Sequence, residues 1–343
     1  MYQKERFQNN YDFLRVFSAL GIMFSHSFDL LNNDKYEPLR ILTNGRMSFS
    51  FISLSVFFSI SGYLIAKSAE RSPNVKNYLW KRLLRIQPLL IIICLLTVFI
   101  IGPAFTNLSI ENYFFNSNTW TYFRNILPAF GLQFTLPGVF INNVAEAGVN
   151  GSLWTLIIEE RMYIFVCLLF LIHKRRSAFI IFLIVPVNLF YLVNRFYSAS
   201  SFIPYFDTGA FFYSLIFLNS ATLYFLRINF CKQLYWYITA SVGMILFGLY
   251  FPFFDFIYFF AIPVLINSVA HVKGITNKAG KYGDFTYGIY VFAFPVQQIF
   301  IASGIPLNSY KLFLYSVSLV VPLAVLSWHL LEKRFLKLKV LIK

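Results

Sequence analysis

Long apolar runs separated by short polar segments make up most of the chain. A membrane-spanning helix needs about 17–25 consecutive, mostly apolar residues. By this criterion the pattern predicts ten spans, with ends placed to within about four residues. They cover residues 12–31, 48–66, 86–104, 154–172, 178–195, 209–226, 235–251, 254–270, 284–302 and 311–331. We therefore expect an all-α fold: a polytopic membrane helix bundle of about ten transmembrane helices, with residues 1–343 forming a single integral-membrane domain.

One connection is much longer than the others and contains a further apolar piece. It covers residues 105–153, and its residues 130–140 are mostly apolar, with Pro128 and Pro137 as interruptions. A re-entrant helix or a helix on the membrane surface fits this pattern. The sequence thus allows an eleventh helical element there.

Composition supports the membrane assignment. Of the 343 residues, 58% are hydrophobic and only 13% are charged, whereas a soluble domain carries about 25% charged residues. The net charge of +15 would suggest nucleic-acid binding in a soluble protein. Here the basic residues lie between apolar spans, so we expect a lipid bilayer as the partner and no nucleic acid.

The basic residues also orient the spans. If the N-terminus is cytoplasmic, the inside connections are residues 67–85, 173–177, 227–232, 271–284 and 332–343, and all are rich in Lys and Arg. Outside connections, such as 105–153 and 196–208, have few basic residues. Cytoplasmic connections of membrane proteins carry such an excess. The pattern predicts that both termini are cytoplasmic.

The first span carries two costly polar residues. Its stretch "YDFLRVFSALGIMFSH" (11–26) contains Arg15 and His26. They are three helical turns plus about 20° apart, so they share one face with Asp12, and the rise between them is about 16 Å. Arg15 falls near the cytoplasmic mouth and His26 in the outer half. Arg15 alone would fit a snorkelling anchor and His26 a packing residue, but the shared face favours a polar track in the bundle interior.

The fourth span adds a carboxylate. Glu159 lies about two turns below the outer end of "GSLWTLIIEERMY" (151–163), at a depth similar to that of His26. Tyr163 shares its face. Three successive charges at 159–161 are unlike a lipid-facing surface. An ion pair network with a structural role is the alternative to a site.

Two more stretches have both a structural and a functional interpretation. Ser59, Ser61 and Gly62 in the second span could permit close helix packing or open a path for a thin substrate. Arg82 and Arg85 at the cytoplasmic start of the third span could bind phosphate groups or anchor the helix. No His, Asp or Glu pair has metal-ligand spacing, so we expect no metal site. We expect Glu332, after the last span, to be a solvated interface charge.

Together these stretches resemble the membrane acyltransferase-3 family, the O-acyltransferases of bacterial surface glycans, from Tyr11 to about Glu332. The first-span stretch is similar to the family's arginine and histidine separated by ten residues. "FFSISGYL", "RLLRIQP" and "LWTLIIEERMY" resemble its Phe-Phe-x-x-Ser-Gly-x-Leu, Arg-x-x-Pro and Leu-Trp-Ser-Leu-x-x-Glu-x-x-x-Tyr patterns. "YGDFTYGIYVFAFPV" resembles its late Ser-Tyr-x-x-Tyr-x-x-His-x-Pro stretch, except that Thr286 replaces the serine and Ala293 the histidine. The chemistry then depends on His26.

The resemblance implies a multi-pass enzyme of the bacterial inner membrane. Its donor would be a cytoplasmic acyl-CoA, most often acetyl-CoA, and no cofactor would be bound permanently. Its acceptor would be a surface glycan or a lipid-linked sugar. The acyl group, the acceptor hydroxyl and the oligomeric state stay open.

The expected site combines these residues. Arg15, Arg82 and Arg85 would hold the anionic donor, and the pantetheine arm would pass between the first two spans, along Ser59 and Ser61. His26 would act as general base or transient acyl carrier, with Glu159 orienting its imidazole and Tyr163 on the donor side. A transporter or flippase for a glycan or lipid is the main alternative, and a membrane sensor or assembly partner is a third. Labelled acetyl-CoA separates them, since only the enzyme yields labelled acceptor.

Overall fold

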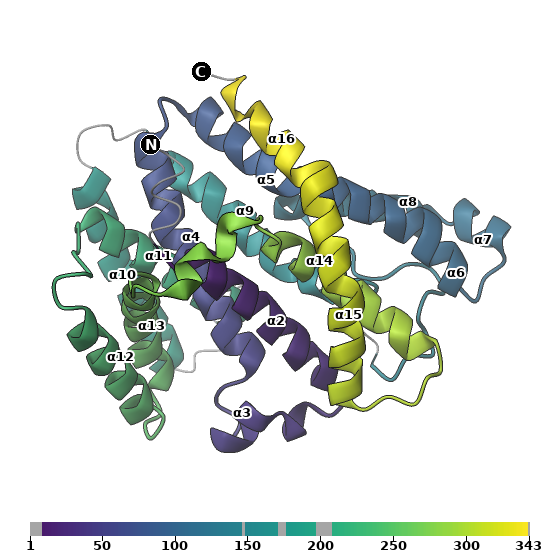
Figure 1. Cartoon of the computed structure of the whole chain (residues 1–343), viewed down its shortest axis with the longest axis horizontal. Helices are drawn as coiled ribbons and strands as arrows, with labels where there is room; N and C mark the ends of the chain where they lie inside the picture. Colours follow the sequence, from purple (N-terminus) through teal and green to yellow (C-terminus); the bar gives the residue numbers. More distant parts are fainter. Residues whose placement is uncertain (1–8, 146–147, 171–175, 197–207, 342–343) are drawn as a thin grey trace. The chain divides into compact units, whose positions relative to one another are not determined.

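The computed structural model describes residues 9–145, 148–170, 176–196 and 208–341. These residues are almost entirely helical (Figure 1) and include no strand, only one isolated antiparallel bridge between Thr106 and Val139. The all-α fold class is therefore confirmed for this part of the chain. In chain order the elements are α2 (Tyr11–Asp29), η1 (Asp34–Tyr36), α3 (Pro38–Leu42), α4 (Phe49–Arg71), α5 (Val75–Leu96), η2 (Thr97–Ile101), α6 (Gly102–Phe105), α7 (Ile110–Phe115), α8 (Ser117–Thr121), η3 (Tyr122–Ile126), η4 (Pro128–Phe130), η5 (Gly151–Leu153), α9 (Trp154–Val166), η6 (Cys167–Phe170), α10 (Arg176–Phe196), α11 (Thr208–Phe225), α12 (Leu234–Gly248), α13 (Phe254–Ala270), η7 (Ile275–Lys281), α14 (Thr286–Ala302), α15 (Ser309–Ser327), η8 (Trp328–Glu332), α16 (Lys333–Lys337) and η9 (Leu338–Val340).

Each predicted apolar span overlaps one of the helices α2, α4, α5 and α9 to α15. The start of the third span is wrong, since α5 begins at Val75 and not near residue 86, and the helical stretch continues to Phe105. Residues 171–172 of the fourth span lie outside the described residues. Among the described residues, three helical stretches are long and apolar enough to cross a membrane: Phe49–Arg71, Val75–Phe105 and Ser309–Val340. Shorter apolar helices include Phe254–Ala270 and Thr286–Ala302. The number of ten crossings and the cytoplasmic position of both termini stay predictions.

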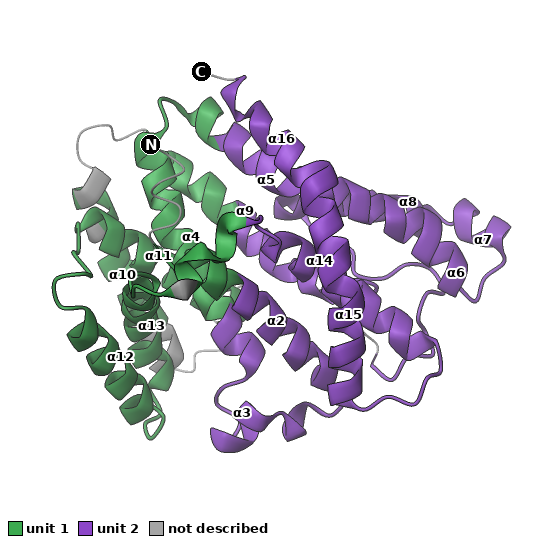
Figure 2. Ribbon diagram, viewed as in Figure 1, with its two compact units in different colours: residues 1–15, 54–78, 161–281 green, residues 16–53, 79–160, 282–343 purple. Residues whose placement is uncertain are grey.

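The chain divides into two compact units, each made of three segments (Figure 2). Unit 1 comprises residues 1–15, 54–78 and 161–281, and unit 2 comprises residues 16–53, 79–160 and 282–343. The segments alternate along the chain, so neither unit is a contiguous piece of sequence. The single membrane domain stays a prediction.

Unit 1 is held by interhelical packing among α4, α10, α11 and α13. Gly62 of α4 allows the closest approach, because a Cβ there would lie 2.1 Å from the carbonyl oxygen of Phe217 in α11. Asn219 of α11 donates to the carbonyl of Phe259 in α13 at 3.2 Å. Small residues and side-chain amides are the usual means of association between apolar helices.

Unit 2 is built around α14, which packs along α15. All residues of α14 from Thr286 to Gln298 are buried. Gly288 lets the two helices meet, since a Cβ there would lie 2.9 Å from the Cα of Ala324 in α15. A helix buried on every side can present polar groups only to its protein neighbours.

The eleventh helical element at residues 130–140 is a wrong prediction. Helix η4 ends at Phe130, and residues 131–136 have no regular secondary structure. Gly131 and Gly138 have φ angles of +133° and +70°, outside the helical region. Three apolar side chains of this segment, Leu136, Val139 and Phe140, instead join a buried cluster with Cys94, Val98, Tyr113, Tyr122 and Val149. Phe130 and Phe134 of the same segment are exposed.

Candidate active site

One face of α14 connects three of the motifs found in the sequence. Tyr287, Tyr290, Phe294 and Gln297 follow one another at intervals of three and four residues, so they lie on one side of the helix. The rise from the first to the last is about 15 Å. Tyr287 contacts α5, Tyr290 contacts η5 and α9, and both Phe294 and Gln297 contact α2. This face of α14 thus forms a line of contacts through unit 2.

At the N-terminal end of α14, an ion pair joins it to α5. The Nη2 of Arg85 donates to the Oδ2 of Asp284 at 2.8 Å, and the hydroxyl of Tyr287 donates to the carbonyl of Ile86 at 3.0 Å. Arg85 is thus engaged by a carboxylate within the unit. Any phosphate that it binds must compete with Asp284.

Glu332 lies near the same ion pair, within electrostatic reach of Arg85 and Asp284. It is 3% exposed, so the expectation of a solvated interface charge is wrong. Its Oε1 accepts from the hydroxyl of Ser327 at 2.9 Å. Its Oε2 is buried without a hydrogen-bond partner among the described residues. The π-helical turn η8 ends at Glu332, and such turns occur frequently at functional sites.

In the middle of α14, hydrogen bonds join the late motif, at Tyr290, to the fourth-span motif, at Ser152 and Thr155. The hydroxyl of Tyr290 bonds to the hydroxyl of Thr155 and donates to the carbonyl of Ser152. Thr155 stands where the resembling family has serine, and it keeps the hydroxyl that this contact needs. The side chain of Asn150 donates to the carbonyl of Val291 at 3.1 Å. The start of α9 is therefore fixed against α14.

The two adjacent carboxylates of α9 have different surroundings. Glu160 is buried and accepts from Gln87 at 2.7 Å and from the backbone N–H of Ala129 at 2.8 Å, so it ties α5 and η4 to α9. Glu159 is half-buried and lies within electrostatic reach of Tyr287 and Tyr290. The hydrogen-bond donors to Glu160 are a side-chain amide and a backbone N–H, which gives this carboxylate a structural role.

Near its C-terminal end, α14 contacts the histidine of the first motif. The rings of Phe294 and His26 meet edge to face, with centroids 5.4 Å apart. Gln297, one turn further, donates to the carbonyl of Met23 at 2.8 Å and to the hydroxyl of Ser27 at 2.7 Å. These contacts hold the segment of α2 that carries His26 against α14.

The carboxylate beside the imidazole is Asp29. Its Oδ2 lies 3.6 Å from the Nδ1 of His26, and the His26 side chain is 18% exposed. The predicted pairing of Glu159 with His26 stays a prediction. Sequence reasoning missed Asp29, although its spacing of three residues from His26 on one helix was a usable signal.

The remaining predicted residues are distributed as follows. Arg82 is half-buried on α5 in unit 2, whereas Arg15, Ser59, Ser61 and Tyr163 belong to unit 1. Ser59 is fully buried, and its carbonyl accepts from the hydroxyl of Ser220 in α11 at 2.6 Å. Tyr163 is buried, and its carbonyl accepts from the hydroxyl of Tyr78 at 3.2 Å. The hydroxyl of Ser59 is buried with no hydrogen-bond partner among the described residues, and its role as a donor contact stays a prediction.

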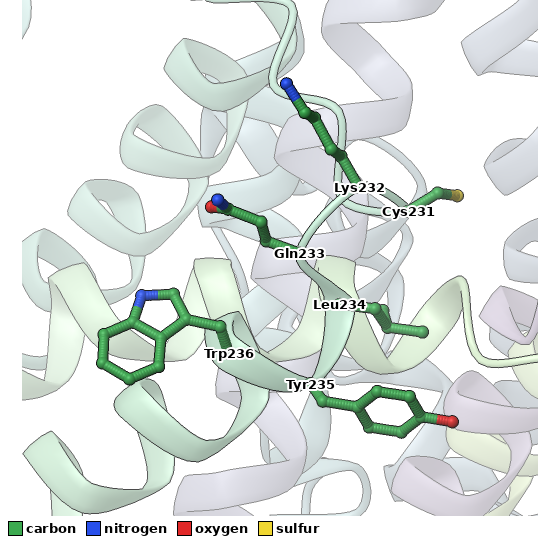
Figure 3. Close-up of a pocket in the computed structure, with 6 residues that line it drawn as sticks. All are labelled: Cys231, Lys232, Gln233, Leu234, Tyr235 and Trp236. Atoms are coloured by element: carbon green, nitrogen blue, oxygen red, sulfur yellow. The ribbon is translucent and has the colours of Figure 1, made fainter.

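Figure 3 shows a surface pocket of unit 1 that does not have the character of an active site. The pocket has a volume of about 440 Å³ and is lined by six consecutive residues: Cys231, Lys232, Gln233, Leu234, Tyr235 and Trp236. Their side chains point in different directions, whereas a binding site has polar groups that converge on a ligand. None of the predicted site residues lines this pocket.

Comparison with known proteins gives one family and several relatives. A family model described as "Acyltransferase domain" matches residues 8–332. The "O-acetyl transferase" of Shigella phage Sf6 is 31% identical over 339 residues, which cover 96% of each protein. "Nodulation protein 10" of Rhizobium leguminosarum bv. viciae is 26% identical over 97% of this chain and 94% of the relative. The "Peptidoglycan O-acetyltransferase OatA" of Listeria monocytogenes is 28% identical over 127 residues, 33% of this chain and 18% of the relative. No solved structure gives a significant match.

Proposed function

The chain belongs to the acyltransferase family whose model matches residues 8–332, and on this premise we propose that it is an inner-membrane O-acetyltransferase. In this proposal an acetyl group moves from cytoplasmic acetyl-CoA to a hydroxyl of a surface polysaccharide or of its lipid-linked precursor. The printed names of the relatives support acetyl transfer to oxygen. The observation that carries the proposal is the gathering of His26, Thr155 and Arg85 along α14, each from a different motif.

The reaction needs a base for the acceptor hydroxyl. In the proposed mechanism, the Nε2 of His26 removes the hydroxyl proton while the oxygen attacks the thioester carbonyl carbon. The C–S bond breaks as the tetrahedral intermediate collapses, and the coenzyme A thiolate takes the proton back from the imidazolium. The products are the acetyl ester and free coenzyme A. Assistance of this kind contributes about 10²–10⁴-fold to the rate.

The donor would enter from the Arg85 end of α14. Arg82 and Arg85 lie there on α5, and Arg15 lies three turns before His26 on α2. A guanidinium suits phosphate because its N–H groups match two oxygens at once. The distance from Asp284 to Phe294 along the chain corresponds to about 15 Å of helix. An extended pantetheine arm would follow this line so that the thioester reaches His26.

The carboxylate and hydroxyl groups beside this line would serve the transfer. Glu159 would favour the imidazolium by its negative charge from the side of α9. Ser59, Ser61 and Tyr163 stay proposed donor contacts on the evidence of their motifs alone. The group that orients the His26 ring is then Asp29, whose Oδ2 lies 3.6 Å from Nδ1.

Mass spectrometry of surface glycans tests the proposal. Cells that produce the wild-type protein should carry glycan with an added acetyl mass, which should be absent when His26→Ala replaces it. The variant should be present in the membrane at the wild-type level, because the contacts of Gln297 with Met23 and Ser27 still hold this part of α2 against α14. Acetylated glycan at the normal level in cells with His26→Ala would remove His26 from the chemistry.

A further inference from the structure

Asp29 occupies an unusual position for a helix residue. It is the last residue of α2, where the partial negative charge of the helix end opposes a carboxylate. Its presence there works against helix stability. The carboxylate faces the imidazole one turn earlier, with 3.6 Å between Oδ2 and Nδ1 of His26. The position of Asp29 is thus better explained by its contact with His26 than by a contribution to the stability of α2.

Arg40 holds the other side of this carboxylate. The Nη2 of Arg40 in α3 lies 3.5 Å from the Oδ1 of Asp29. The same guanidinium contacts Asp34 at 3.6 Å and Glu37 at 3.1 Å. Asp29 therefore has one oxygen toward Arg40 and the other toward His26.

Glu37 fixes Arg40 in place. It is fully buried, and it accepts hydrogen bonds from the hydroxyl of Ser25 in α2 and the backbone N–H of Phe49 at the start of α4. Its third contact is the Nε of Arg40. A buried carboxylate with partners on three elements has little conformational freedom. Glu37 therefore holds the guanidinium of Arg40 in place, and Arg40 in turn holds the carboxylate of Asp29.

We propose that Asp29, held by Arg40, is the positioning residue of His26. This inference rests on the proposed function, in which His26 is the base. Asp29 keeps the imidazole proton on Nδ1, which leaves the lone pair of Nε2 for the acceptor hydroxyl, and its charge favours the imidazolium after proton transfer. Asp29 itself gains no proton. The 3.6 Å separation shortens when substrate is bound, as hydrogen bonds of catalytic groups commonly do.

Steady-state kinetics of acetyl transfer in membranes test the role. Asp29→Ala should lower kcat about 10²-fold, within the range for groups that orient a catalytic imidazole, and leave the KM for acetyl-CoA unchanged. Asp29→Glu should recover part of that loss. The matched control is Asp34→Ala, which removes another carboxylate from Arg40 without touching His26 and should stay within about twofold of wild type.

Nitrogen-15 NMR of labelled histidine gives a readout that is independent of activity. The chain has four histidines, so the His26 signals are identified by their loss in His26→Ala. The wild type and Asp34→Ala should show the Nδ1–H form of the neutral ring, and Asp29→Ala should shift the population toward Nε2–H. A purely structural role of Asp29 would leave this ratio unchanged.

The outcomes separate the two proposals. If His26→Ala is inactive but Asp29→Ala keeps wild-type kcat and the wild-type tautomer ratio, the positioning role is overturned while the proposed function stands. If His26→Ala retains full activity, both the base and its positioning residue are overturned. A lower kcat together with a shifted tautomer ratio supports the inference.

Discussion

Among the single residues, Arg85 and Asp284 form a mostly buried ion pair that holds α5 against the start of α14. The Asp284 side chain is 8% exposed and that of Arg85 is 23% exposed. Removal of one partner leaves the other charge poorly solvated, which costs about 3–5 kcal/mol when a pair is buried. We expect Asp284→Ala to lower the free energy of unfolding by about 3 kcal/mol. The lower end of the range applies because Arg85 stays partly exposed to solvent and still has the negative charge of Glu332 nearby.

Unfolding of the purified protein in detergent, with Arg85→Ala and the double variant alongside, measures this. The double variant should cost clearly less than the sum of the two single variants, since neither charge is then left alone. Strictly additive losses would mean that the two side chains do not stabilise each other.

The residues also show how far sequence reasoning reaches. Helical spacing places Arg15 and His26 on one face, because that relation lies within a single helix. Spacing gives no means to predict which carboxylates lie near His26, since that depends on how the chain continues and packs. Asp29 is only three residues from His26 in sequence, but it lies where the span ends, so the apolar pattern does not mark it. Glu332 was misjudged for a similar reason, since basic neighbours in sequence do not reveal that a side chain is buried.

At the scale of the elements, the contact of α4 with α11 depends on Gly62. Any side chain there would place its Cβ 2.1 Å from the backbone oxygen of Phe217, which cannot move without the helix. We expect Gly62→Ala to destabilise the protein by about 1–3 kcal/mol, the usual cost of overpacking. The chain offers a matched control in Gly243 of α12, where a Cβ would meet nothing within 4 Å.

Thermal unfolding in detergent compares the two glycine variants. Gly243→Ala should raise Tm slightly, because alanine favours a helix interior by about 0.5–1 kcal/mol over glycine, whereas Gly62→Ala should lower it. A Gly62→Ala protein as stable as the Gly243→Ala protein would show that α4 and α11 do not pack as closely as described.

The elements themselves were largely predictable, since each of the ten apolar runs overlaps a helix. Apolar length was a weaker guide in the long connection. Leu136, Val139 and Phe140 pack in a cluster with Cys94 and Val98 of α5 and η2, and the positive φ angles of Gly131 and Gly138 are incompatible with a helix. The role of α14 as the element that meets three motifs could not be predicted from spacing, since a pattern shows which residues share a face but not what that face contacts.

At the scale of the whole molecule, the distribution of basic residues predicts which connections are cytoplasmic. Cys231 lies in the predicted inside connection 227–232 and is exposed. A membrane-impermeant maleimide should therefore label it in inside-out vesicles but not in intact cells. As a control, Asn112→Cys in a Cys231→Ser background places an exposed thiol in the predicted outside connection. That thiol should react in intact cells, and the reverse pattern at both positions would invert the topology.

We propose that this molecule makes an ester bond with His26 as the base, rather than moving a substrate across the membrane. Radiolabelled acetyl-CoA and the acceptor glycan, incubated with membranes that contain either the wild type or His26→Ala, distinguish these two functions. We expect covalently labelled, base-labile acetyl ester on the glycan with the wild type, and at least 10²-fold less with the variant. Equal labelling by both proteins, or uptake of substrate by the wild type with no ester formed, would contradict this proposal.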